Sequence, residues 1–224
     1  MTDWPGVRER VLALAAVPGS DKAFGAMGHG FALDAPLTAA EVADVQAWFG
    51  VELPEDYRSF LLHVGAGGAG PAYGAFPVRR DGSGGWHLVG DSPEEIEPGL
   101  LAEPFPGGVD PVAAVRILAE RPDREDFDDL ADLDVALEMW EERLAEIQYD
   151  PRSTAGALCL CDEGCGLTVW LVVTGSERGR IWRDPRCDGT DLHPMRNADG
   201  SPSDFAGWYL GRLAAAEALC GLDR

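Results

Sequence analysis

The sequence predicts an α+β fold, because segments with helical spacing and segments with strand spacing both occur along the chain. Apolar residues recur three and four positions apart in the first 65 residues and again over residues 127–149, which is the spacing of one helix face. Residues 167–173 form a continuous apolar run, which is typical of a central strand covered on both faces. A turn-length segment at 175–179 then leads to a returning strand at 180–183, as in a hairpin.

Three helices are expected in the N-terminal part of the chain. They cover about residues 4–16, 38–49 and 54–64. The first has Val7, Val11 and Leu14 at helical spacing, which predicts an amphipathic helix. The second opens with Thr38 and Glu41, the two residues of a capping box, in which each side chain satisfies a free backbone N–H of the first turn.

The third helix leads into a glycine-rich segment. Its apolar face consists of Tyr57, Phe60, Leu61 and Val64. Residues 65–70 then match the G-x-G-x-x-G pattern of dinucleotide-binding loops. That interpretation requires the motif to follow a strand and to open a helix, whereas here it follows a predicted helix. We therefore interpret the segment as a backbone hinge between helix and sheet.

Shorter elements are expected in the rest of the chain. They are strands at 73–78 and 86–89 around a turn at 80–85, a short helix at 93–101, a loop at 104–111, a strand at 157–161 and a last helix. The last helix is expected to begin near Ser203, whose hydroxyl can cap it.

The chain is strongly acidic, with a net charge of -21 and a pI near 4.3. Phosphate backbones and anionic lipids would repel it, so nucleic acids and membranes are poor partner candidates. No apolar stretch approaches the length of a membrane span. Residues 91–150 hold 19 Asp and Glu against 4 Arg. This concentration would steer a basic protein partner toward that part of the chain.

The longest predicted helix, residues 127–149, carries much of this charge. Its expected apolar stripe consists of Leu130, Leu133, Leu137, Trp140, Leu144 and Ile147. The candidate docking residues are Asp128, Asp132, Glu142 and Glu146 on the opposite face, with Glu138 beside them. A solvated acidic face that only keeps the protein soluble is the alternative interpretation.

The cysteines predict neither a disulfide framework nor a metal centre. An odd number of five cysteines favours reduced thiols in the cytosol. Cys159, Cys161, Cys165 and Cys187 could be drawn as a zinc site, but C-x-x-C spacing is absent. Cys159 and Cys161 are expected on one side of a strand as small apolar residues. We expect no metal and no cofactor.

Two further residues are candidates for binding. His29 lies between two glycines, where a loop histidine bonded to backbone is favoured over a ligand-binding role. Trp86 lies on a predicted strand, where a tryptophan is a core residue by default. It also follows Gly84 and Gly85, and it would be a partner anchor if it were exposed. No histidine motif or G-x-S-x-G elbow is present, so no catalytic residues are assigned.

Three segments together carry a resemblance to a known family. The first is a helix–Leu-Pro–helix opening that ends in a glycine-rich turn, with Leu53, Pro54, Tyr57, Phe60, Leu61, Gly67 and Gly68. The second is a strand pair around Gly164 and Gly166, and the third is a closing helix that begins with Ser203 and Phe205. With these features the chain resembles the SUKH superfamily in its Smi/Knr-like branch, over about residues 24–213, and most closely an actinobacterial-type subgroup.

The resemblance implies a central, mostly antiparallel sheet with helices packed around it. Segment 110–150 is larger than the family pattern, which implies an acidic helical insertion. We expect an N-terminal helix within residues 1–20 and a single domain over 21–224. Bacterial relatives are often immunity proteins that neutralise a toxin, and fungal relatives are scaffolding regulators of cell-wall synthesis. The family has no catalytic residue set.

These observations predict a cytoplasmic, non-enzymatic protein-binding module. The leading hypothesis is an immunity protein that binds a basic toxin domain. A scaffold for endogenous proteins is the first alternative. A small-ligand or nucleotide binder that uses the glycine-rich turn and His29 is the second.

Overall fold

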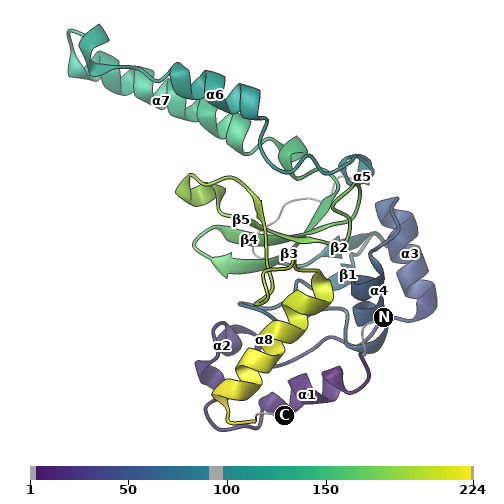
Figure 1. Ribbon diagram of the computed structural model, residues 1–224. Helices are drawn as coiled ribbons and strands as arrows, with labels where there is room; N and C mark the ends of the chain where they lie inside the picture. Colours follow the sequence, from purple (N-terminus) through teal and green to yellow (C-terminus); the bar gives the residue numbers. More distant parts are fainter. Residues whose placement is uncertain (1–3, 91–97, 223–224) are drawn as a thin grey trace.

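The computed structural model describes residues 4–90 and 98–222, and it is a mixed α+β structure (Figure 1). The α-helices are α1 (Val7–Leu14), α2 (Ala26–His29), α3 (Ala39–Phe49), α4 (Glu55–His63), α5 (Pro98–Leu101), α6 (Pro111–Ala119), α7 (Leu130–Gln148) and α8 (Phe205–Leu219). The strands are β1 (Val78–Arg80), β2 (Trp86–Leu88), β3 (Ala157–Gly164), β4 (Leu167–Val172), β5 (Ile181–Asp184) and β6 (His193–Pro194). Short 3-10 turns include η3 (Pro151–Thr154) and η4 (Arg186–Asp188).

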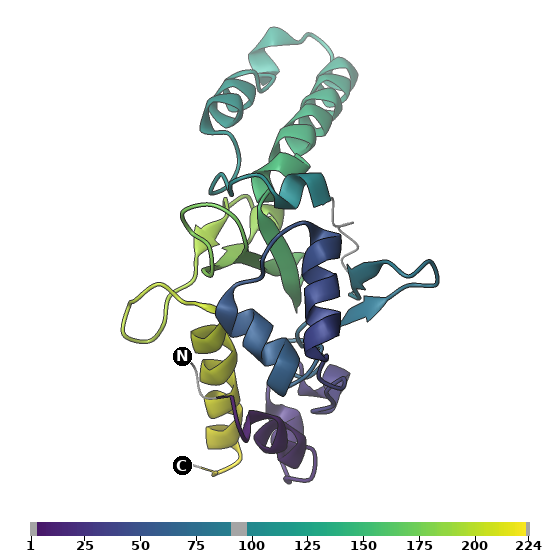
Figure 2. The ribbon, with the colours of Figure 1, turned by 90° about the vertical axis from the view of Figure 1, so that its right-hand side faces the viewer.

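The central sheet has four antiparallel strands in the order β3-β4-β5-β6. β4 lies between β3 and β5 and is buried on both faces: Val169 and Leu171 face the main core, and Trp170 and Val172 face a smaller cluster. The continuous apolar run therefore does mark a doubly covered strand. The predicted α+β class and antiparallel sheet are confirmed. A separate hairpin of β1 and β2 projects from the body (Figure 2).

Cys159 and Cys161 do not share one side of β3, as the alternation predicted. The pairing of β3 with β4 shifts register between them, as in a β-bulge, which places one additional residue in one strand. Cys159 consequently packs in the smaller cluster and Cys161 in the main core. Burial raises the pKa of the Cys161 thiol to about 12, so this side chain is a neutral core residue.

The main core lies between the sheet and helices α1, α4 and α8. Rings from Trp4 before α1, from α4 and from α8 meet there, with Trp4 to Phe60 centroids 5.7 Å apart and Phe60 to Tyr209 centroids 4.7 Å apart. The Tyr209 hydroxyl also donates a 2.7 Å hydrogen bond to the Ala69 carbonyl. The N-terminal helix thus shares one core with the segments that follow it.

Most helix ends follow the sequence signals. Thr38 and Glu41 form the expected capping box of α3, with the Glu41 N–H donating to the Thr38 hydroxyl at 3.2 Å. Helix α8 begins near Ser203 as predicted, but the predicted cap was wrong, because Asp204 caps the helix by accepting the Gly207 N–H at 2.8 Å. Ser203 is instead a buried residue before the helix.

The strand expected at 73–78 is not formed, and only its last residue belongs to β1. Ala72 and Gly74 have φ angles of 49° and 105°. These left-handed conformations interrupt an extended chain. The short helix expected at 93–101 lies partly outside the described residues, and its described part is α5.

The glycine-rich segment joins α4 to the region before β1. Gly68 exchanges two 2.8 Å backbone hydrogen bonds with Ala75. A Cβ on Gly67 would lie 2.4 Å from the Pro77 Cα, and one on Gly68 would lie 2.5 Å from the Ala32 oxygen. Other backbone therefore occupies the space beside these glycines, and the segment does not open a helix as a dinucleotide-binding loop does.

Candidate functional site

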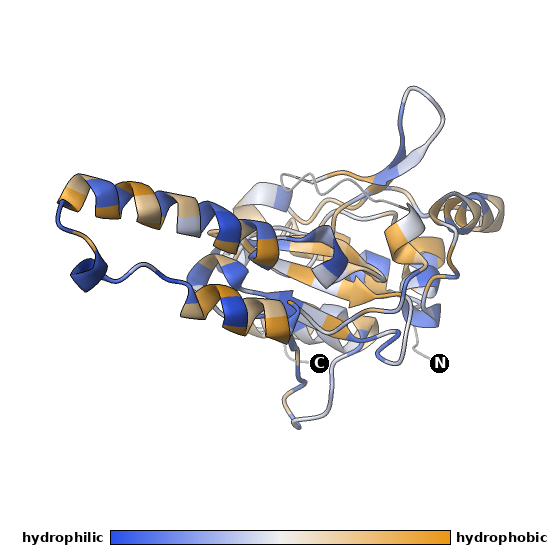
Figure 3. Ribbon diagram, turned by 90° about the horizontal axis from the view of Figure 1, so that it is seen from above, coloured by the Kyte–Doolittle hydropathy of each residue, from blue (hydrophilic) through white to orange (hydrophobic). Residues whose placement is uncertain are grey.

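Helices α6 and α7 form a hairpin that projects from one end of the central sheet (Figure 1). Seen from above, polar and apolar residues alternate along both helices (Figure 3). We call residues 110–149 the α6–α7 hairpin. Its length and its charge make it the candidate functional site.

An apolar seam holds the two helices together. Ile117 of α6 and Leu133 and Trp140 of α7 are buried, as the stripe predicted for α7. The Trp140 indole N–H donates a 2.7 Å hydrogen bond to the Ile117 carbonyl, which fixes the register of the pair. Leu130, also assigned to the stripe, is 59% exposed, because it is the first residue of α7 and lies beyond the seam.

Polar caps define where each helix of the hairpin begins. The Asp110 carboxylate accepts the Val112 N–H at 2.9 Å, and Pro111 occupies the first turn of α6. The Asp129 carboxylate accepts the Ala131 N–H at 2.9 Å at the start of α7. Carboxylates are favoured at such positions because helix N-termini carry positive partial charge.

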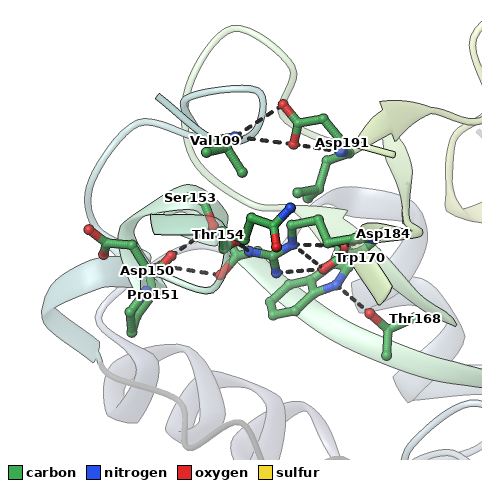
Figure 4. Close-up of polar contacts among 12 residues, drawn as sticks. Val109, Asp150, Pro151, Ser153, Thr154, Thr168, Trp170, Asp184 and Asp191 are labelled. Carbon is green, nitrogen blue, oxygen red and sulfur yellow. Dashed lines mark hydrogen bonds and ion pairs between the residues drawn. The ribbon is translucent and has the colours of Figure 1, made fainter. Parts of the chain in front are cut away.

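A buried ion pair fixes the C-terminal end of α7 to the sheet. Arg186 and Asp184 are each 5% exposed, and the Arg186 Nε donates to the Asp184 carboxylate at 2.9 Å. The same guanidinium donates to the Gln148 carbonyl at the end of α7 and to the Ser153 hydroxyl at 2.7 Å (Figure 4). A cation at a helix C-terminus is favoured by the helix dipole.

A second contact holds the chain that enters α6. The Asp191 carboxylate accepts the Val109 N–H at 3.2 Å (Figure 4). Asp191 lies just before β6 and Arg186 lies just after β5. Both ends of the hairpin are therefore attached to the connection between β5 and β6.

The candidate docking residues are all exposed. They are Asp128, Asp132, Glu138, Glu142 and Glu146. Asp128 precedes the first turn of α7, and the other four lie on the helix. Helix α7 contains six carboxylates and only one basic side chain, Arg143. Arg143 is paired with Glu120 of α6. Helix α7 therefore carries a strong excess of negative charge.

Trp86 cannot be an exposed anchor, because it is only 5% exposed. Its ring packs under the Arg80 guanidinium at 4.6 Å, and its indole N–H approaches the Asp44 carboxylate at 3.4 Å. The neighbouring glycines left an exposed position open, but Trp86 lies on β2, and its side chain packs in the main core.

The family-motif residues have structural positions. Leu53, Tyr57, Phe60, Leu61 and Phe205 are at most 3% exposed in the main core, and Pro54 is buried before α4. Gly164 and Gly166 have φ angles of 90° and 80° at the turn between β3 and β4. Their missing Cβ atoms leave room for the Tyr73 ring and for Cys187.

His29 is bonded to backbone, as favoured from the sequence. Its Nδ1 accepts the Phe31 N–H at 3.0 Å, and burial lowers the pKa of the imidazole. Among the residues that the structure describes, no cluster of three or more His, Cys, Asp or Glu could hold a metal ion. In the same described part, no helix is long and apolar enough to cross a membrane.

Sequence reasoning missed α6 and the attachment of the hairpin. Pro111 after Asp110 is a helix-start signal, but the prolines before it favoured a loop. The Arg186 contacts join residues 184–186 to residues 148–153, which are distant in sequence, so no local pattern predicts them. Only the spacing of Asp184 and Arg186 directly after a predicted strand could have drawn attention to the pair.

A comparison with known protein families identifies the family of this chain. A family model described as "SMI1 / KNR4 family (SUKH-1)" matches residues 36–194, well over half of the chain. The chain belongs to the SMI1/KNR4 (SUKH-1) family. The match includes the α6–α7 hairpin and ends at β6, so α1, α2 and α8 lie outside it. Comparisons with curated proteins and with solved structures gave no match.

The SUKH-1 family includes toxin-immunity proteins, and its members are generally non-enzymatic immunity or regulatory proteins. The narrower actinobacterial-type subgroup is not distinguished by this match.

Proposed function

We propose that this SUKH-1 protein is a cytoplasmic immunity protein that binds and neutralises a basic toxin domain without catalysis. The observation that carries the proposal is the projecting acidic hairpin, whose two ends are attached to the sheet. The family supplies the class of activity. The hairpin, which we regard as an insertion in a single domain, supplies a docking surface on this chain.

The charge of the hairpin fits such a partner. A toxin that acts on nucleic acid needs a basic surface to hold phosphate. An acidic surface would be drawn to it, would associate faster at low salt and would cover the phosphate-binding face. Asp128, Asp132, Glu138, Glu142 and Glu146 are the residues that we propose for this contact.

A charge-reversal pair of variants tests the proposal. The hairpin variant is D132K/E142K/E146K, and the control is E9K/D21K/E52K, whose three carboxylates are exposed on the body of the protein. Both variants change the net charge equally. Tagged forms of the wild type and of both variants would be used to capture partners from the host lysate at low and at moderate salt, with identification by mass spectrometry.

We expect one abundant, salt-sensitive, toxin-like partner for the wild type and the control. For the hairpin variant we expect association with the purified partner to slow by about tenfold or more and to lose most of its salt dependence. Equal binding by the two variants would contradict docking through the hairpin. Several housekeeping proteins in place of one partner would favour a scaffolding role instead.

A further inference from the structure

The outer face of α7 carries a stripe of exposed side chains at heptad spacing. The stripe consists of Asp132, Val135, Met139, Glu142 and Glu146. Successive members are three and four residues apart, the spacing of the contact positions of a two-helix coiled coil. Val135 and Met139 at its centre are 56% and 60% exposed, although both are large and apolar.

Helix α6 leaves this stripe uncovered. The α7 residues buried in the hairpin seam are Leu133 and Trp140, which lie on the opposite side of the helix from Val135 and Met139. Helix α7 packs mainly against α6, and the hairpin projects away from the sheet (Figure 1). The apolar centre of the stripe therefore faces outward.

The charges of the stripe restrict what can cover it. A second copy of this chain would place Asp132 opposite Glu146 in an antiparallel pair, or each acid opposite itself in a parallel pair, and like charges oppose both. An anionic membrane surface is repelled for the same reason. A positively charged partner element is attracted along the whole stripe.

We propose that the stripe seats a basic amphipathic α-helix of the partner protein. The partner's apolar residues would pack on Val135 and Met139, and its Lys or Arg residues would flank them against the carboxylates. The stripe covers the 15 residues from Asp132 to Glu146, whose ends are about 21 Å apart at the rise of an α-helix. It therefore accepts about four turns of a partner helix. This inference rests on the proposed function and specifies the partner element.

A synthetic peptide serves as the probe. It has three heptads with Leu at the a and d positions and Lys at the e and g positions, whose mutual repulsion opposes self-association. A matched peptide carries Glu in place of each Lys. Fluorescence anisotropy with the full-length protein gives the affinity, and circular dichroism gives the helix content of the bound peptide.

The test variant is V135S/M139S, and the matched control is V112S/V115S. The control residues are 76% and 69% exposed on α6 of the same hairpin. We expect the Lys peptide to gain helix on binding, the test variant to bind it about tenfold more weakly, and the control to stay within about twofold. V135A/M139A, which keeps strong helix propensity, is the second variant if the serine variant unfolds.

Equal affinity of the wild type and the test variant would overturn the inference. Equal weakening in the control, or a bound peptide without added helix, would overturn it as well. These outcomes are separable from a failure of the proposed function. One such outcome is that charge reversal disrupts partner binding while V135S/M139S leaves peptide binding unchanged. That result would support docking through the hairpin and would contradict binding of a helix on the stripe.

Discussion

At the scale of single residues, Arg186 has the largest expected effect on folding. Arg186→Ala would leave the Asp184 carboxylate buried without its cation and would free the Gln148 carbonyl at the end of α7. Breaking a buried pair from one side destabilises proteins by about 3–5 kcal/mol. We expect a loss of this size in the free energy of unfolding, measured by urea denaturation.

Arg58→Ala is the matched control for that measurement. Arg58 pairs with Glu55 at 2.7 Å, but both side chains are exposed, 40% and 58%. Exposed pairs contribute about 0–1 kcal/mol. If the two arginine variants lose similar stability, Arg186 does not hold the hairpin in the way described above.

Two glycines are expected to respond to alanine in opposite directions. Gly68 has a φ of 107°, and its added Cβ would lie 2.5 Å from the Ala32 oxygen. Backbone strain alone should therefore lower the free energy of unfolding of the Gly68→Ala variant by about 1–3 kcal/mol. Gly211 lies within α8 with open space beside it. Gly211→Ala should therefore raise the free energy of unfolding by about 0.5–1 kcal/mol. Thermal unfolding of both variants checks the signs, and stabilisation by Gly68→Ala would contradict the packing of the glycine-rich segment.

Burial and helix capping were predicted correctly for residues whose surroundings are formed by neighbours in sequence. Val7, Val11 and Leu14 are buried as their spacing indicated, and the Thr38 capping box is formed. The contacts of Trp86 were not predictable in this way, because one of its partners, Asp44, is distant in sequence.

At the scale of elements, the hairpin is expected to be separable from the body. Replacing residues 111–146 by a short Gly-Ser linker keeps the Val109 and Gln148 contacts with Asp191 and Arg186. The main core contains no residue from the removed segment. We expect a single cooperative unfolding transition, less helix by circular dichroism and no partner capture. Loss of cooperative unfolding would show that the hairpin is part of the folding unit.

Long, periodic elements could be predicted, and short ones could not. The predicted helix at 127–149 agrees with α7 within a few residues, because nineteen residues give the periodicity many repeats. Helix α6 has nine residues and follows a Pro- and Gly-rich segment, so loop signals outweighed its own pattern. The tilt of the pair away from the sheet depends on Arg186 and Asp191, which are distant in sequence.

At the scale of the whole molecule, charge repulsion is expected to lower stability at low salt. The net charge of -21 favours expanded states. The Debye length falls from about 30 Å at 0.01 M to about 10 Å at 0.1 M salt, so the melting temperature should rise over this range. D132K/E142K/E146K has a net charge of -15, because three charges of -1 become +1, and should show a smaller rise. A flat profile for the wild type would contradict this account.

The antiparallel sheet and its central strand were predictable because the apolar run and the turn after it are contiguous in the sequence. The packing on the second face of the sheet was not predictable, because the residues that cover it are far apart along the chain. They are Phe76, Phe105 and Leu192. The candidate docking residues were chosen from their charge and from their place opposite the predicted apolar stripe. The structure adds that they are exposed on a projecting hairpin, which no composition could indicate.

The way in which the hairpin is attached has a consequence for how the protein can acquire new specificity. Substitutions on the outer face of α7 touch neither the seam with α6 nor the main core, and such surface changes usually alter stability by less than about 0.5 kcal/mol. The proposed recognition surface can therefore vary extensively while the fold and its attachment at Arg186 and Asp191 stay intact. A lineage that faces a succession of different toxins could exchange one binding face for another without having to restore a damaged core each time.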